Sequence, residues 1–168
     1  LFYQGAAGAE RVFKILDAEP NIKEIHSAPN LNIKKGNIKF EKVSFAYPKT
    51  EEQAIKNISF SIDGGTTVAL VGHSGAGKST IVNLLPRFYD PKKGTVSIDE
   101  QNISSVTLSS LRKNISMVSQ DVILFDDTIR ANVAYADMSA SEEKIKEACD
   151  FAAATEFIEK LPQKYETI

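Results

Sequence analysis

The chain offers little sulfur or imidazole chemistry. Its 168 residues include one cysteine, two histidines and no tryptophan. A lone cysteine, Cys149, excludes an internal disulfide and is typical of a protein kept in a reducing compartment. With only His26 and His73 beside it, the chain also lacks the ligands for a zinc site built from histidine and cysteine.

An excess of charge of one sign is missing as well. The chain has 20 basic and 22 acidic side chains, a net charge of −2, so we expect no nucleic-acid partner. No run approaches the roughly 18 apolar residues of a membrane-spanning helix, and the N-terminus lacks the pattern of a secretory signal. Hydrophobic residues still make up 42% of the chain, enough for the core of a soluble domain. A role at a membrane must then come from a partner or from a segment outside this sequence.

Punctuation by proline and glycine predicts three parts. Residues 6–18 form a predicted helix that ends before Pro20, with one apolar face made of Ala9, Val12, Phe13 and Leu16. Residues 19–36 hold two prolines and three asparagines without any period, which is typical of an extended linker. The folded domain is then expected to begin near Asn37, which divides the chain into 1–18, 19–36 and 37–168.

The remainder alternates between strand and helix patterns, which predicts an α/β fold. Strands are predicted at 38–47, 55–62, 66–71, 95–99 and 115–119; the first should contain a bulge and the third should be buried on both faces. Helices are predicted at 78–85 and 107–113. A last helix should start at a capping box of Ser139 and Glu142 and bury a stripe of Ile145, Ala148, Cys149 and Ala152.

The most informative segment is the P-loop, G-x-x-x-x-G-K-[ST], between a predicted strand and a predicted helix. Its residues are Gly72, His73, Ser74, Gly75, Ala76, Gly77, Lys78, Ser79 and Thr80. Glycines allow successive backbone N–H groups to turn toward phosphate oxygens, and the start of the helix adds partial positive charge. Lys78 should reach the β and γ phosphates, the Ser79 hydroxyl should bind Mg²⁺, and Thr80 can donate to the α phosphate. The alternative is a glycine-rich turn that only joins strand to helix.

A P-loop alone fits kinases, GTPases and several kinds of ATPase, so the surrounding segments must discriminate. The segments are IKFEKVSFAYP, GHSGAGKST, LLPRFYDPKKG and ISMVSQDVILFDDTIRANV. With them, the chain resembles the nucleotide-binding domain of an ATP-binding cassette (ABC) exporter from Ile38 to its end. The resemblance implies a P-loop NTPase core with an antiparallel β subdomain and the start of a helical subdomain. It also makes residues 1–18 similar to the end of the last transmembrane helix and the linker of a half-transporter.

The resemblance assigns roles to residues outside the P-loop. Tyr47 matches the aromatic residue that stacks on adenine, although it could be an ordinary tyrosine at a strand end. Gln120 matches the glutamine that binds Mg²⁺ and moves with the transmembrane partner. The apolar cluster of Val122, Ile123, Leu124 and Phe125 matches the surface that receives the membrane domain, and its alternative is simple core. ATP and Mg²⁺ are the implied cofactors, and the implied partners are the transmembrane domain and a second nucleotide-binding domain in a homodimer.

Other family motifs do not occur in these 168 residues: the LSGGQ signature, the Walker B aspartate, the catalytic glutamate, the D-loop and the switch histidine. We therefore assign no catalytic residue here and expect this fragment to bind nucleotide without hydrolysing it, whereas its parent should be an ATPase. Asp99 and Glu100 suit the turn of an antiparallel hairpin, although the family usually has glycine at position 100. Asp126 and Asp127 suit a helix cap better than a metal site. Without the remaining strands, apolar side chains around 68–71 should be uncovered.

The resemblance places the parent at the cytoplasmic face of the inner membrane, where it would export a lipid or another hydrophobic compound. Two other classes stay open. One is a non-transporter P-loop enzyme such as a small-molecule kinase, which would need a basic substrate lid that the sequence does not show. The other is a regulatory module that binds nucleotide without turnover.

Overall fold

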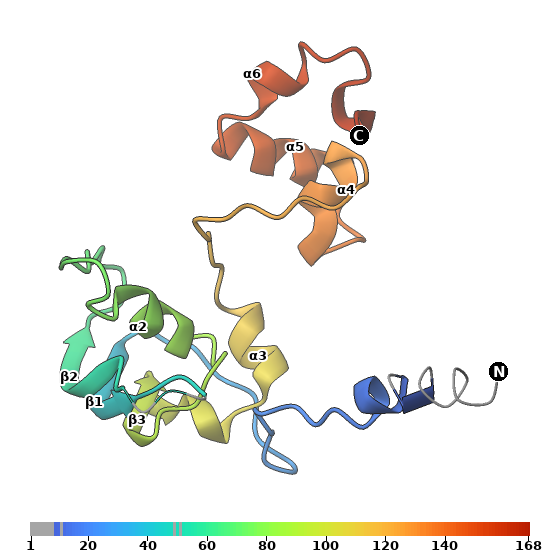
Figure 1. The fold of residues 1–168 in the computed structure, drawn as a ribbon. Coiled ribbons are helices and arrows are strands. Elements are labelled where there is room, and N and C mark those ends of the chain that lie inside the picture. The colour runs from blue at the N-terminus through green and yellow to red at the C-terminus, as the bar shows by residue number, and fades with distance from the viewer. Residues whose placement is uncertain (1–8, 11, 49, 51) are drawn as a thin grey trace. The chain divides into compact units, whose positions relative to one another are not determined.

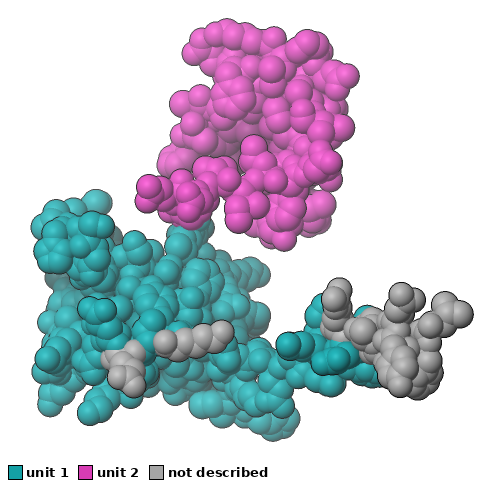
Figure 2. All heavy atoms as spheres, viewed as in Figure 1, with its two compact units in different colours: residues 1–117 teal, residues 118–168 magenta. Residues whose placement is uncertain are grey.

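The computed structural model describes residues 9–10, 12–48, 50 and 52–168, and these form two compact units, 1–117 and 118–168 (Figure 2). Part of the helix predicted at 6–18 lies outside the described residues. Residues 9–10 and 12–16 are helical, and the apolar side chains of Val12, Phe13 and Leu16 on this segment are exposed.

The first unit is built on a four-stranded antiparallel sheet in the order β2-β1-β3-β4 (Figure 1). The strands are β1 (Ile38–Phe45), β2 (Ile55–Ile62), β3 (Lys93–Ile98) and β4 (Gln101–Asn102). The register of β1 against β2 shifts between Phe40 and Val43 and again between Val43 and Phe45, which confirms the predicted bulge. Three helical segments accompany the sheet: α2 (Lys78–Leu84), η1 (Ile103–Ser105) and α3 (Leu108–Lys113).

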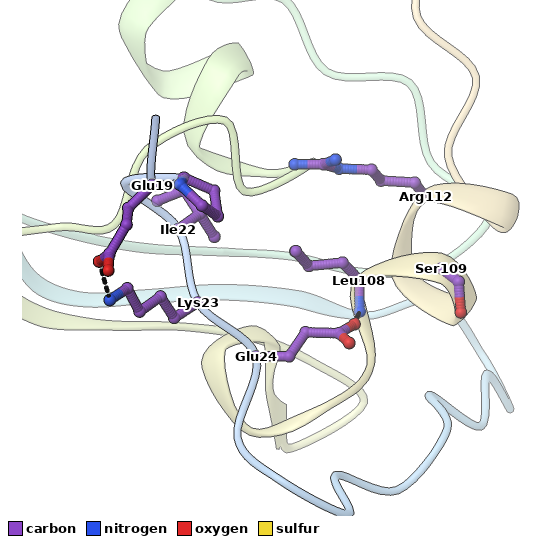
Figure 3. A pocket seen from close by; sticks show the side chains of 8 residues that line it. Glu19, Ile22, Lys23, Glu24, Leu108, Ser109 and Arg112 are labelled. Carbon is purple, nitrogen blue, oxygen red and sulfur yellow. Dashed lines mark hydrogen bonds and ion pairs between the residues drawn. The ribbon is translucent and has the colours of Figure 1, made fainter. Parts of the chain in front are cut away.

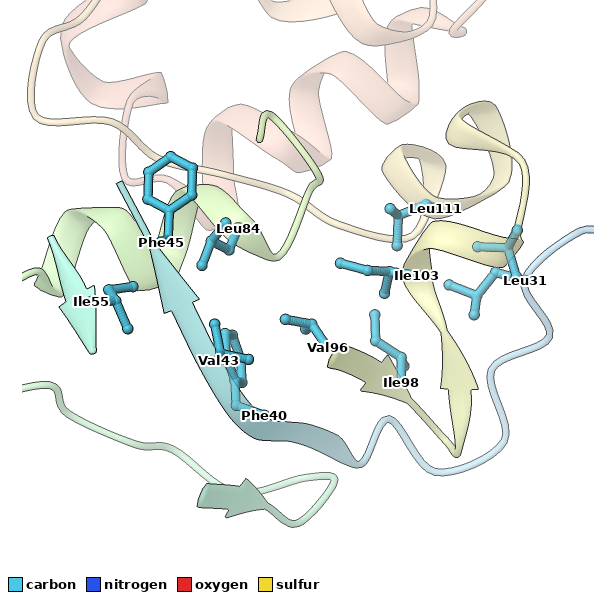
Figure 4. Packing of buried hydrophobic residues seen from close by; sticks show 11 residues of the cluster. Leu31, Phe40, Val43, Phe45, Ile55, Leu84, Val96, Ile98, Ile103 and Leu111 are labelled. Atoms are coloured by element: carbon cyan, nitrogen blue, oxygen red, sulfur yellow. The ribbon is translucent and has the colours of Figure 1, made fainter. Parts of the chain in front are cut away.

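Alternation along the strands places one set of side chains in a shared core (Figure 4). Leu84 from α2 and Leu111 from α3 are fully buried in it, so both helices pack on strand residues. On β1, the ring of Phe40 stacks on that of Phe60 from β2, with centroids 4.6 Å apart. The buried members are Leu31, Phe40, Val43, Phe45, Ile55, Leu84, Val96, Ile98, Ile103, Val106 and Leu111.

Two predicted strands are wrong. Residues 66–71 and 115–119 are neither helix nor strand, and they join no strand of the described sheet. Val71 is 90% exposed, so residues 66–71 lack the burial on both faces that their apolar sequence predicts. In the second segment, Val118 is 97% exposed. A parallel strand depends on neighbouring strands for its hydrogen bonds and on helices to cover its faces. The hydrophobic pattern of the segment itself does not reveal whether those strands and helices are present. The expected exposure of apolar side chains around 68–71 is confirmed.

Residues 19–36 run without helix or strand, yet they are bound to the first unit along most of their length. The N–H of Leu31 donates to the Ser110 hydroxyl at 2.8 Å, and Leu31 itself is buried. Closer to the N-terminus, Glu24 accepts a hydrogen bond from the N–H of Leu108 at the start of α3 (Figure 3). The segment is therefore part of the folded surface of this unit.

The strongest of these attachments is made by Asp99, in the β3–β4 turn. Its carboxylate accepts hydrogen bonds from four successive backbone N–H groups, those of residues 34–37, at 2.7–3.0 Å. These N–H donors, first of all that of Gly36, hold the pKa of Asp99 well below its usual value. Asp99 and Glu100 have φ angles of 46° and 66°, which confirms that they are turn residues. Glu100 therefore occupies a conformation in which glycine carries no steric cost.

Across its described residues, the second unit contains helices and no strand. It contains α4 (Ile129–Val133), η2 (Ala134–Ala136), α5 (Glu142–Phe151), α6 (Thr155–Ile158) and η3 (Lys164–Glu166). Its core is small and consists of Ala134, Ile145, Cys149, Ile158 and Tyr165. The predicted stripe on α5 is correct for Ile145 and Cys149, whereas Ala148 and Ala152 are exposed. Burial raises the pKa of the Cys149 thiol, which makes it a poor nucleophile.

Polar contacts fix the helix ends of this unit. The Thr128 hydroxyl accepts from the N–H of Ala131 and caps α4, so Asp127 is not the cap that the sequence predicts. Ser141 caps α5 in place of Ser139. In both cases the true cap stands one or two residues nearer the helix. Among the residues that the structure describes, none of the helices combines the length and the apolar character needed to span a bilayer.

Candidate nucleotide-binding site

The P-loop connects residues 66–71 to α2 and curls by means of its glycines. Gly75 and Gly77 have φ angles of 80° and 85°, and the N–H of Ala76 donates to the His73 carbonyl at 3.2 Å. At Gly77 an added Cβ would lie 2.6 Å from the Ala54 carbonyl oxygen. Position 77 therefore requires glycine both for its left-handed backbone and for the close approach of the chain before β2.

The start of α2 presents unpaired donors. Gly77 is the N-cap residue and has no side chain to accept from the first turn. The N–H groups of Lys78, Ser79 and Thr80 donate to no acceptor in the described part of the chain. Residues 72–76 of the loop are exposed, so anionic oxygens can approach them from solvent. Phosphate oxygens are the acceptors that such a set of N–H groups suits.

Lys78 supplies the positive charge. Its Nζ donates to the carbonyl oxygens of Gly72 and His73, both at 2.8 Å, so the side chain bends back across the loop. A phosphate oxygen is a stronger acceptor for an ammonium group than a neutral carbonyl is. The ammonium group is therefore placed at the mouth of the loop, where it can exchange carbonyl oxygens for phosphate oxygens. His73 turns its Nδ1 toward the Ser74 carbonyl, at 2.7 Å.

The structure brings Tyr47 to the P-loop, although 33 residues separate it from Thr80. The Tyr47 and Thr80 hydroxyls lie 3.0 Å apart and share a hydrogen bond. Thr80 is buried, whereas Ser79 beside it is exposed. Tyr47 is half-buried and belongs to a cluster of three aromatic rings with Phe45 and Tyr89.

Tyr89 is the residue of this site that sequence reasoning missed. It follows α2 in the segment LLPRFYDPKKG, and its ring meets that of Tyr47 edge to face, with centroids 5.2 Å apart and planes at 87°. The available signal was an aromatic residue in a turn, where a side chain would ordinarily be solvated. Nothing in the spacing indicated that the turn folds back to the end of β1.

The residues fit a magnesium ion that is bound mainly by phosphate and water. Within the described ranges, no three His, Cys, Asp or Glu side chains gather closely enough to hold a metal ion. Mg²⁺ in nucleotide sites keeps several waters and phosphate oxygens and takes few protein ligands. The exposed Ser79 hydroxyl, next to the unpaired N–H groups, can serve as such a ligand. Gln120 lies in the second unit and is exposed there.

The apolar cluster after Gln120 is not core. Val122, Ile123 and Leu124 are 77%, 81% and 74% exposed. Phe125 stacks on Tyr135 with ring centroids 4.4 Å apart, and its N–H donates to the Asn132 side chain at 2.8 Å. Leu124 and Phe125 also line a cavity of about 650 Å³ that extends over α4 and α6. The second unit thus presents an apolar surface that its own described residues do not cover.

A wider cavity, of about 850 Å³, lies elsewhere on the first unit (Figure 3). It runs between residues 19–24 and α3, and its walls include Ile22, Leu108 and Arg112. No P-loop residue and no ring of the Tyr47 cluster lines it. Volume alone would therefore point away from the phosphate-binding geometry.

Comparisons with known proteins agree with this geometry. The profile of the ABC transporter family matches residues 55–167. An ATP-dependent lipid A-core flippase of Haemophilus influenzae is 49% identical over 99% of this chain. An uncharacterized ABC transporter ATP-binding protein of Bacillus subtilis, YfiC, is 43% identical over 96% of it. The chain spans 28% and 27% of the lengths of these two relatives.

A solved structure is similar as well. A bacterial Atm1-family ABC exporter with ATP bound superposes with a TM-score of 0.90 and 40% sequence identity, over 99% of this chain and 29% of the other. The match includes the antiparallel sheet and the P-loop helix, so the fold is that of part of an ABC-type P-loop ATPase domain, as the sequence predicts. The chain belongs to the ABC transporter family.

Proposed function

We propose that this chain is the ATP-binding portion of an ABC exporter that couples ATP binding and hydrolysis to the export of a lipid or another hydrophobic compound. The observation that carries the proposal is the set of unpaired N–H groups at residues 78–80 beside the Lys78 ammonium group. The names of the relatives, a lipid A-core flippase among them, support the transport class.

Each residue of the site has a task in this proposal. The loop from Gly72 to Gly77 wraps the β and γ phosphates with its N–H groups, and Lys78 neutralises part of their charge. Thr80 donates to the α phosphate once its hydroxyl turns from Tyr47. The Ser79 hydroxyl would hold Mg²⁺, which would supply charge neutralisation at the phosphates, and the metal-binding role of Gln120 stays a prediction from the family resemblance. The Tyr47 ring provides a flat face for adenine.

The proposed partners follow from the second unit and from the family. A transmembrane domain would dock on the exposed cluster of Val122, Ile123, Leu124 and Phe125. That arrangement would place the chain at the cytoplasmic face of the inner membrane. A second nucleotide-binding domain would complete the ATP site in a homodimer. Nothing in the balanced charge of the chain favours a nucleic acid.

Titration with a fluorescent ATP analogue and Mg²⁺ tests the phosphate-binding step. Lys78→Ala removes the ammonium group that lies at the loop, and we expect the dissociation constant to rise by about 10- to 100-fold. Lys113→Ala, an exposed lysine at the end of α3, is the matched control and should bind as the wild type does. Equal affinity of Lys78→Ala and wild type would contradict the proposal.

A further inference from the structure

We propose that Tyr89 is a positioning residue for the adenine base, because it fixes the orientation of the Tyr47 ring. The inference rests on the proposed function, since it concerns the same nucleotide. It adds a residue whose ring is placed to act only through another side chain. Tyr89 lies beyond α2, outside the P-loop and outside the strand that carries Tyr47.

The hydrogen bond of Tyr47 anchors only one end of its ring. The bond from its hydroxyl to Thr80 is 3.0 Å long and fixes the tip of the side chain. A hydroxyl lies on the axis about which a tyrosine ring turns, so this bond leaves the plane of the ring undetermined. A base that stacks needs that plane to be set in advance, because otherwise binding must order it.

Two neighbouring rings set the plane. Phe45 meets Tyr47 with centroids 4.9 Å apart and planes at 82°, and Tyr89 meets it at 5.2 Å and 87°. Both contacts have the edge-to-face geometry that aromatic pairs favour. Neither neighbour lies parallel to Tyr47, so neither occupies the stacked arrangement that a base would take. Phe45 is part of the buried core, which leaves Tyr89 as the half-buried member at the surface.

The turn that carries Tyr89 is itself fixed. Arg87 binds Asp90 through two hydrogen bonds, from Nε at 2.7 Å and from the terminal nitrogen at 3.1 Å. The same nitrogen donates to the Lys23 carbonyl at 3.1 Å, and the Arg87 side chain is only 4% exposed. Arg87 also has a φ of 54°, a left-handed conformation that a non-glycine residue keeps only where its surroundings hold it.

A backbone hydrogen bond then fixes the position of this turn relative to β1, the strand before Tyr47. The N–H of Lys92 donates to the Ser44 carbonyl at 2.9 Å, three residues away from each of the two tyrosines. The distance between Tyr89 and Tyr47 is therefore set by the backbone and by an ion pair in which the arginine is buried. A side chain placed in this way can hold a neighbour without any contact to the nucleotide phosphates.

Competition binding separates a role at the base from a role at the phosphates. Tyr89→Leu keeps apolar volume but removes the ring edge, and we expect it to weaken binding of the fluorescent ATP analogue by about 3- to 10-fold. Displacement by inorganic tripolyphosphate, which has no base, should be unchanged. Tyr89→Phe keeps the ring and should bind as the wild type does. Tyr135→Leu, in the second unit, is the matched tyrosine control.

A double variant tests whether Tyr89 acts through Tyr47. Tyr47→Ala should weaken the ATP analogue by more than Tyr89→Leu does, and the double variant should bind no more weakly than Tyr47→Ala alone. Should Tyr89→Leu fail to fold, Asp90→Asn loosens the turn without touching the ring, and it should weaken the ATP analogue in the same selective way.

Three results would overturn the inference: unchanged ATP affinity in Tyr89→Leu, an equal loss for ATP and tripolyphosphate, or fully additive losses in the double variant. Failure of the proposed function looks different, because Lys78→Ala would then leave both ligands unaffected. If Lys78→Ala weakens binding of the ATP analogue and Tyr89→Leu does not, the positioning role of Tyr89 is wrong, whereas the proposed ATP binding stands.

Discussion

Each of the two units of the molecule is stabilised internally in a different way. Among its described residues, the first has eleven buried ones in one core, and its strands pair residues far apart in the sequence, such as Ile38 with Ile98. The second has five buried residues in its core and helices of three to ten residues. Arg130 links three of its elements, since it donates to Glu142 at 3.1 Å and to Glu166 at 2.6 Å.

The difference separates nucleotide binding from surface contact. Tyr47, Tyr89 and the P-loop all depend on the larger core, because α2 and the end of β1 are packed through it. The second unit has little apolar interior relative to its exposed apolar surface, so apolar burial contributes less to its stability than it does in the first unit. A unit of this kind is expected to open more readily than one built on a sheet.

Removal of core volume from the first unit gives the largest expected effect. Leu84 is fully buried between α2 and the sheet. Leu84→Ala should lower the free energy of unfolding of this unit by about 2–5 kcal/mol, because it leaves a cavity that the neighbours fill only in part. Native-state hydrogen exchange, followed separately for the amides of each unit, measures it.

Val82→Ala on the same helix is the control, since Val82 is 44% exposed and its loss should be small. The amides of the second unit should keep their exchange rates in Leu84→Ala. A parallel loss of protection in both units would break the comparison, since it would show a single cooperative structure.

The second effect is that of Asp99, which ties residues 34–37 to the β3–β4 turn. Its native pKa lies below the ordinary value of 3.8, so the ionised carboxylate stabilises the fold above that pH. This contribution is lost as the pH falls below 3.8 toward the native pKa. Asp99→Asn should therefore unfold at a lower temperature than the wild type at neutral pH, and the gap should close in acid.

Thermal melts of the two proteins from pH 7 down to pH 2 test this dependence. Asp63→Asn, another exposed aspartate in a turn of the same unit, serves as the control and should show no such convergence. A constant difference between Asp99→Asn and wild type at every pH would mean that the shape of the side chain matters and its charge does not.

The smallest expected effect lies in the second unit. Arg130→Gln removes both ion pairs that join α4, α5 and η3, and the amides of these elements should exchange faster. The side chain is 37% exposed, so added salt should screen the interaction and shrink the difference from wild type. Hydrogen exchange at low and high ionic strength measures it.

Lys160→Gln breaks an exposed pair within one short stretch and is the matched control, with little expected change. If Lys160→Gln and Arg130→Gln behave alike, the links between elements add nothing to local pairs. That result would also remove the distinction between a unit stabilised by its core and one stabilised by its surface.

Local patterns predicted the elements that are stabilised locally. The alternation at 55–62 gave the exact span of β2, and the predicted helix at 78–85 differs from α2 by a single residue. The P-loop could also be predicted, because its glycines stand where the backbone has a positive φ, as at Gly75 and Gly77. The predicted caps at Asp127 and Ser139 are wrong, because several polar residues stand before each helix and propensity does not rank them; the caps are Thr128 and Ser141.

Features that depend on distant partners could not be predicted. Residues 66–71 are apolar enough for a buried strand, but strand formation requires neighbours that sequence periodicity does not report. The contact of Tyr47 with Tyr89 joins the loop after β1 to the loop after α2, two segments that are far apart in the sequence. Asp99 offered no sign that it would bind the backbone of residues 34–37, since an aspartate in a turn is ordinarily solvated.

The attachments of residues 23–37 also decide how the first unit would bear tension. A pull applied at the N-terminal end reaches Lys23 and Glu24 first, where one bond each to Arg87 and Leu108 resists it, and these can be peeled off singly. Beyond them the load reaches residues 29–32, which are hydrogen-bonded to Gln101, Thr107 and Ser110. It then arrives at the four bonds of Asp99, which share it. Only then does it act on β1, a strand clamped between β2 and β3 that must slide lengthwise against both. The attachments of residues 23–37 should thus yield one after another under tension, and the P-loop is reached only after β1 has given way.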